Sequence, residues 1–133
     1  MGLTRVAVTV RKFGSEESYT STFLIDTGSH DSMVSASELK KLGIEPIRKE
    51  FYEMVNGELN EFKLGAAEFE FLGVIVPVQV MFGPDDCEPI IGVIALETAG
   101  FVVDPVAERL RKFPARSLKA LALETVAWRL FIP

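Results

Sequence analysis

The feature that most constrains the fold is a succession of short, strand-like apolar runs separated by turns that contain glycine or proline. The runs cover residues 5–12, 19–25, 49–55, 59–64, 65–72, 74–82, 101–103 and 110–113. Asn56-Gly57 separates two of them, and this dipeptide favours a short hairpin turn. The run 74–82 predicts a strand covered on both faces, in which Pro77 requires an edge or a bulge. Many short strands of this kind are typical of a mainly β sheet that is closed or sandwiched.

Two short helices are expected among the strands. Ser35 can act as the N-cap of the first helix, with Glu38 three residues later as in a capping box. Gly43 suits the left-handed position after the end of this helix. The second helix is expected over 93–99 and is closed by Gly100.

The chain is long enough for one domain with its own core. It has 133 residues, of which 48% are apolar, so it needs neither a metal nor a disulfide to hold the fold together. A single cysteine, Cys87, excludes an internal disulfide and a multi-cysteine zinc site, and it fits the reducing cytoplasm. A single histidine, His30, disfavours sites that require several imidazoles.

The charge argues against nucleic acid as a partner and divides the chain in two. The formal net charge is −5. Residues 1–104 carry 8 basic and 17 acidic residues, whereas 105–133 carry 6 basic and 2 acidic ones, so this basic tail can dock on the acidic body, on a second copy or on an anionic partner. No apolar run reaches the roughly 18 residues of a membrane span, and the first residues lack a signal peptide's apolar core. We therefore expect a cytoplasmic protein without a membrane partner.

Asp26-Thr27-Gly28-Ser29 directly follows the apolar run 19–25 and is the clearest place for chemistry. The strand anchors the aspartate in the core, and glycine allows a second backbone segment to approach. The hydroxyl groups of Thr27 and Ser29 can donate hydrogen bonds to carboxylates or bridge to a neighbouring loop. A carboxylate held in this way is a candidate acid or base. The tripeptide alone, however, is more often an ordinary turn after a strand.

The wider context resembles the retropepsin-like family, the single-domain, homodimeric aspartic proteases of retroviruses and their cellular relatives. The segment 23–29, with Met and Val at 33–34, is similar to the catalytic loop of these enzymes. Pro-Ile-Ile-Gly at 89–92 is similar to the segment that crosses behind that loop. Between them, the hairpin around 56–57 stands where such proteases carry their flap. The resemblance covers about residues 5–113.

The stretches 90–97 and 100–105 look especially like the prokaryotic members of the family. The resemblance implies a mainly β fold, a closed retropepsin-like acid-protease barrel with one or two short helices. It implies a protease domain over residues 1–113, followed by a basic C-terminal extension, 114–133, which we expect to help dimerisation. Within this extension, 117–133 fits a helix followed by a strand.

The resemblance implies an aspartic endopeptidase that hydrolyses peptide bonds in a peptide or protein substrate. An isolated aspartic acid has a pKa of about 3.9 and carries no proton at neutral pH. Two carboxylates about 3 Å apart share one proton and so supply both an acid and a base. The chain contains no second Asp-Thr-Gly or Asp-Ser-Gly, so the second carboxylate would come from Asp26 of another copy in a homodimer. No metal and no organic cofactor is implied.

The resemblance also implies a role for each matching position. Asp26 would activate water, Thr27 would brace the two loops across the dimer, and Gly28 would permit their close approach. The expected substrate-binding residues are Ser29, His30, Met54, Val55, Asn56, Gly57, Ile90 and Ile91. Of these, the hairpin residues would form a lid that excludes water and adds strand-like hydrogen bonds to a bound peptide.

Two positions depart from the retroviral pattern and leave a second function open. Retroviral members commonly have an acidic residue in place of His30 and an arginine in place of Val93, and these form an ion pair that supports the dimer. Their joint absence leaves no unpaired buried charge. The alternative function is a retropepsin-fold dimer that serves as a binding or scaffold module with little or no proteolysis. A β-barrel binder unrelated to proteases would require the order of the motifs to be accidental.

Overall fold

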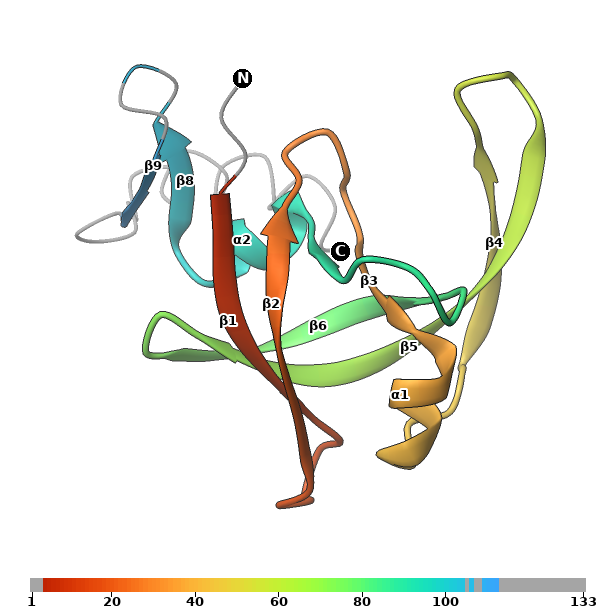
Figure 1. Cartoon of the computed structure of the whole chain (residues 1–133), viewed down its shortest axis with the longest axis horizontal. Helices are drawn as coiled ribbons and strands as arrows, with labels where there is room; N and C mark the ends of the chain where they lie inside the picture. Colours follow the sequence, from red (N-terminus) through yellow and green to blue (C-terminus); the bar gives the residue numbers. More distant parts are fainter. Residues whose placement is uncertain (1–3, 105, 107–108, 113–133) are drawn as a thin grey trace, which may run out of the picture.

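The chain is organised around one large sheet and a small one (Figure 1). The computed structural model describes residues 4–104, 106 and 109–112. The strands are β1 (Thr4–Arg11), β2 (Ser18–Ile25), β3 (Ser32–Ser35), β4 (Arg48–Glu53), β5 (Leu59–Phe71), β6 (Val74–Gly83), β7 (Ile90–Ile91), β8 (Phe101–Asp104) and β9 (Arg109–Lys112). The helices are α1 (Ala36–Lys41) and α2 (Val93–Thr98). The predicted extension 114–133, and the pattern within it, lie outside the described residues.

The strands of the large sheet form a ring. Their order is β1-β2-β7-β3-β6-β5-β4, and an additional pairing between β1 and β5 joins six of them in a closed circuit that leaves out β4. β8 and β9 pair only with each other among the described residues. The arrangement confirms the predicted mainly β fold, with two short helices in the described part of the chain.

The core is built from alternate residues of these strands, as a sheet with one buried face requires. Val8 and Val10 of β1 and Phe23 and Ile25 of β2 are buried, together with Phe69 of β5. The rings of Phe23 and Phe69 meet edge to face, with their centroids 5.7 Å apart. This core lies beneath the end of β2, so the residues that follow β2 start from a fixed position.

The apolar run 74–82 forms β6, but the prediction that both faces would be covered is wrong. Its side chains alternate, with Val76, Val78 and Val80 buried and Ile75, Pro77 and Gln79 exposed. Of the two positions expected for Pro77, an edge or a bulge, the structure shows the edge. In the described ladders, the part of β6 that pairs with β3 is Val80–Gly83. Pro77 lies before that stretch, where β6 has β5 as its neighbour. A residue without an N–H group is tolerated at such a position.

The runs 59–64 and 65–72 form a single strand, β5, instead of two. Its first part pairs with β4, from Leu59 to Leu64, and its second part pairs with β6, from Leu64 to Phe71. The β4–β5 hairpin therefore extends past the ladder with β6, and Figure 1 shows it rising beyond the body of the sheet.

The cap at the start of α1 and the glycines that follow both helices agree with the sequence predictions. The side chain of Ser35 accepts a hydrogen bond from the N–H of Glu38, and Gly43 follows α1 with φ of +78°. Gly100 follows α2 with φ of +86°. The apolar residue Leu39 anchors α1 in the core. Among the described residues, neither helix has the length and apolar character to cross a membrane.

Candidate active site

Asp26 lies directly after β2, and hydrogen bonds fix both its backbone and its side chain. Its N–H donates to the carbonyl of Ile91 at 3.0 Å, and its carbonyl accepts from the N–H of Ser29 at 3.2 Å. Its Oδ1 accepts from the N–H of Gly28 at 2.9 Å. Asp26 is half-buried, whereas Thr27 and Gly28 are exposed. The carboxylate thus has a defined direction and keeps access to solvent.

Residues 26–31 connect β2 to β3 and are called the Asp26 loop. The two strands that flank this loop are held apart by β7. This strand runs parallel to β2, with Ile91 opposite Ile25, and antiparallel to β3, with Ile90 opposite Met33. β2 and β3 follow each other in the chain, yet they are not neighbours in the sheet, because β7 lies between them. The segment 89–92 therefore crosses behind the loop, as the resemblance implied. Ile91 is fully buried and Ile90 half-buried.

Gly92 permits the loop and the crossing segment to touch. A Cβ at this position would lie 2.5 Å from the carbonyl oxygen of His30 and 2.6 Å from that of Asp31, distances that no side chain can occupy. The N–H of Gly92 donates to the hydroxyl of Ser32 at 3.0 Å, and Ser32 is only 1% exposed. The sequence analysis missed Ser32, whose signal is a small hydroxyl residue directly before the apolar Met33.

The start of α2 also binds the loop. Val93 donates its N–H to the carbonyl of Ser29 at 2.8 Å, and Ile94 donates to the carbonyl of His30 at 3.2 Å. The first N–H groups of a helix have no partner within the helix, so the loop carbonyls satisfy them. His30 and Val93 are the positions at which retroviral members carry an ion pair. Here backbone hydrogen bonds join the two segments instead.

The polar side chains of the loop do not gather around Asp26. The hydroxyl of Ser29 donates to the carbonyl of Asp31 at 2.8 Å, so it braces the loop and does not donate to the carboxylate as the sequence suggested. His30 is exposed. In the described part of the chain Asp26 shares a hydrogen bond with no second carboxylate. Among these residues there is also no cluster of three or more His, Cys, Asp and Glu that could hold a metal ion.

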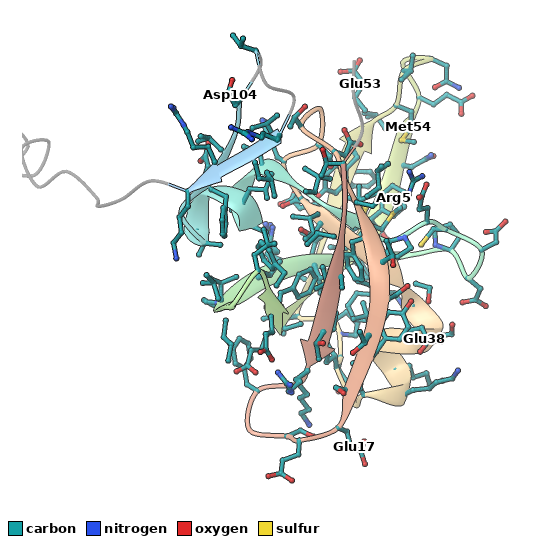
Figure 2. All side chains as sticks on the ribbon, turned by 60° about the vertical axis from the view of Figure 1, so that its left-hand side comes forward. Arg5, Glu17, Glu38, Glu53, Met54 and Asp104 are labelled. Carbon is teal, nitrogen blue, oxygen red and sulfur yellow. The ribbon has the colours of Figure 1, made fainter. Side chains whose placement is uncertain are left out.

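The predicted lid residues, Met54 to Gly57, form the tip of the β4–β5 hairpin. All four residues are exposed, so the side chains of Met54, Val55 and Asn56 are available for contact. Gly57 has φ of +85°, but Asn56 is not left-handed; its Oδ1 instead accepts from the N–H of Glu58 at 3.0 Å. Figure 2 shows Met54 at the same end of the molecule as Asp104, opposite Glu17. The Asp26 loop, between β2 and β3, reaches this same end in Figure 1.

The hairpin touches the Asp26 loop through Tyr52, below the tip. Its hydroxyl donates to Oδ2 of Asp31 at 2.5 Å, and Nε2 of Gln79 donates to Oδ1 of the same carboxylate at 3.2 Å. Burial, followed by the hydrogen bond to Asp31 and its negative charge, raises the pKa of the Tyr52 phenol. Sequence reasoning missed this cluster. The available signal was an aspartate within the motif region and a tyrosine in β4, a strand of mostly charged residues.

A pocket of about 510 Å³ lies elsewhere, between α1, the chain that follows it and β5. It is lined by Ala36, Lys40, Ile44, Glu45, Pro46, Glu61, Phe62, Lys63 and Phe82. None of the predicted site residues lines it. Its walls carry both lysine and glutamate side chains, so its charge favours no particular ligand.

Comparison with known proteins agrees with this geometry. A family model described as aspartyl protease matches residues 8–98. The matched stretch contains the Asp26 loop, the β4–β5 hairpin and β7, which are the three features that carry the resemblance. No curated protein matches the chain. With most of its length matched by this model, the chain belongs to the retropepsin-like aspartyl protease family.

Proposed function

We propose that the chain is an aspartic endopeptidase that works as a homodimer. Asp26 of each copy contributes one carboxylate to a pair that shares a proton. The ionised carboxylate takes a proton from water, whose oxygen attacks the peptide carbonyl carbon. The protonated carboxylate gives its proton to the carbonyl oxygen, and the C–N bond then breaks as a proton passes to the leaving nitrogen. Membership of the aspartyl protease family supports this chemistry.

The observation that carries the proposal is the fixed position of Asp26. Its backbone bonds to Ile91 and Ser29, and its Oδ1 bonds to Gly28, while the residue stays half-buried. General acid and base catalysis requires a carboxylate held in a defined geometry and accessible to water. Because each chain supplies one such aspartate, a second copy completes the pair.

The remaining residues take supporting roles in this proposal. Thr27 and Gly28, both exposed, meet their counterparts in the second copy. Ser29 and Ile91 hold the loop through their hydrogen bonds. The substrate lies beneath the exposed tip of the hairpin, residues 54–57, and contacts Ile90 and His30. The ring of strands corresponds to the acid-protease barrel, and residues 114–133 add to the dimer interface.

The first test compares two aspartate variants in the cleavage of a dye-labelled, unfolded casein. Asp26→Asn keeps the size of the side chain but cannot exchange a proton, so we expect cleavage to fall by about a thousandfold or more. Asp85→Asn is the matched control, because Asp85 lies exposed in the turn after β6, and it should cleave at the wild-type rate. An unchanged rate for Asp26→Asn would remove this residue from the mechanism.

A second test asks whether two chains share one site. Increasing amounts of the Asp26→Asn chain are mixed with a fixed amount of wild-type chain. If each copy supplies half of the site, mixed dimers are inactive and the activity falls as the variant is added. If one chain is sufficient, the activity of the wild-type chain stays constant. A wild-type chain that dimerises and captures a partner without cleaving peptides would favour the scaffold alternative.

A further inference from the structure

Side chains that the proposed mechanism does not use join the hairpin to the Asp26 loop. We propose that Tyr52, Asp31 and Gln79 position the β4–β5 hairpin above the Asp26 loop and thereby set how tightly a peptide is held beneath it. The part of this inference that concerns peptide binding rests on the proposed function. The positioning itself is a property of the folded chain and is tested separately.

The first argument is that one carboxylate accepts hydrogen bonds from two strands. Asp31 belongs to the loop that begins at Asp26 and lies directly before β3. Its Oδ2 accepts from Tyr52 of β4 at 2.5 Å, and its Oδ1 accepts from Gln79 of β6 at 3.2 Å. Hydrogen bonds to an ionised acceptor are about twice as strong as those between neutral groups. One carboxylate therefore joins the loop, the sheet and the hairpin.

The second argument is the distance that the contact spans. β6 and β5 lie between β3 and β4 in the sheet order. At about 4.8 Å per strand, a flat sheet would separate β3 from β4 by about 14 Å. The contact between Tyr52 and Asp31 thus requires the hairpin to curl back toward the loop. A bond that exists only in the curled arrangement favours that arrangement over an open one.

The third argument is that neighbouring side chains fix the tyrosine and the glutamine. The ring of Tyr52 meets the ring of Phe62 edge to face, with centroids 5.6 Å apart. Arg48 donates to Oε1 of Gln79 at 3.1 Å and also pairs with Glu50. Arg48, Glu50 and Tyr52 alternate along β4, so they share one face of the strand. The three form a continuous polar row that ends at Asp31.

The fourth argument is that, in the part of the chain that the structure describes, few contacts hold the hairpin apart from this cluster and the bond between Arg48 and Gln79. Residues 59–63 of β5 pair with β4 but lie outside the ladder with β6. A two-stranded ribbon on its own is at best marginally stable in water. On β4, only the side chain of Tyr52 is half-buried, and the others are exposed. Loss of the tyrosine hydroxyl should therefore loosen this ribbon and leave the rest of the fold unchanged.

Hydrogen–deuterium exchange of the full chain tests the positioning directly. Tyr52→Phe removes only the hydroxyl, and we expect amides in 48–62 to exchange about tenfold faster while those of the core strands keep their rates. Tyr19→Phe is the matched control, because it removes a phenolic hydroxyl from β2, outside this cluster, and the hairpin should keep its wild-type rates. Wild-type exchange of 48–62 in Tyr52→Phe would overturn the proposal.

Coupling between the two partners gives a second readout. Asp31→Asn should also speed exchange in 48–62, and the double variant with Tyr52→Phe should add less than about twofold to the larger single effect, because both remove one interaction. If the increase in exchange rate of the double variant equals the product of the two single increases, the residues act independently. That result would overturn the proposal.

Cleavage kinetics test the consequence for binding. If the hairpin of Tyr52→Phe is correctly placed about a tenth of the time, KM for unfolded casein should rise about tenfold while kcat stays within about twofold. A fall in kcat at constant KM would overturn the positioning role, because it would place the hydroxyl in the chemical step. A chain that cleaves nothing but shows the exchange effect would overturn the proposed function and support the positioning.

Discussion

The β7 crossing and the β4–β5 hairpin both contact the Asp26 loop, and they are built in opposite ways. At the crossing, backbone groups of four segments bond to one another over a buried core, and Gly92 leaves no room for a side chain. At the hairpin, most side chains are exposed, and the tie to the loop is made by the side chain of Tyr52.

The difference corresponds to two requirements of the peptidase that we propose. The group that performs chemistry has to be held within a fraction of an ångström, which a dense backbone network provides. A cover over the substrate has to open and close, so it must be attached by few contacts. The crossing is held by a dense backbone network, whereas the hairpin is attached by few contacts.

The largest effect that we expect comes from adding a side chain at the β7 crossing. Gly92→Ala should lower the free energy of unfolding by about 3 kcal/mol or more, because its Cβ would overlap the carbonyl groups of His30 and Asp31. Urea denaturation measures this. Gly57→Ala at the hairpin tip is the comparison, with open space around its Cβ but a φ of +85°, and should cost about 1 kcal/mol. Equal costs would remove the distinction between the two regions.

A smaller effect is expected from removing one polar partner at the crossing. Ser32→Ala deprives the N–H of Gly92 of its buried acceptor and should cost about 1–3 kcal/mol in the same assay. Ser18→Ala, at the exposed start of β2, is the control and should stay within about 0.5 kcal/mol of wild type. A negligible loss for Ser32→Ala would show that this hydroxyl adds nothing to the backbone hydrogen bonds and packing at the crossing.

The smallest effect concerns alkaline pH and sharpens the comparison at the hairpin. The pKa of Tyr52 is raised in the folded chain above its ordinary value of 10.0, so the unfolded chain loses the phenolic proton first. Stability from this group is complete below pH 10.0 and decreases as the pH rises above it. Wild type should therefore lose more stability than Tyr52→Phe above this pH, by under about 1 kcal/mol since the ring is partly exposed. Parallel losses in urea titrations would contradict this.

The sequence predicted most strands and both helices because their signals are local. The alternation of valine in β1, the cap at Ser35 and the glycines after each helix are each read within a few residues. The β5–β6 turn shows the limit of this approach. Leu72 adopts φ of +51° there, a position that turn rules reserve for asparagine or glycine, so the ladders on either side must impose it.

In the candidate site, too, the sequence predicted the local motifs and missed the contacts between distant strands. The Asp26 loop and the crossing segment were recognisable because their motifs are contiguous in the sequence. Tyr52 and Gln79 were not, because they meet Asp31 only through the curl of the sheet. Ser29 was expected to support the carboxylate, but its hydroxyl donates to the backbone carbonyl of Asp31. Contacts between distant strands depend on register and twist, which no local pattern encodes.

The unbroken length of β5 has a consequence for how this chain can vary. One end of the strand serves the hairpin and the other serves the ring, and Leu64 belongs to both ladders. Inserting or deleting one residue near Leu64 would reverse the inside and outside faces of one half relative to the other. The tip at 54–57 has no such restriction. Family members should therefore differ in length at the tip and keep the middle of the strand free of gaps.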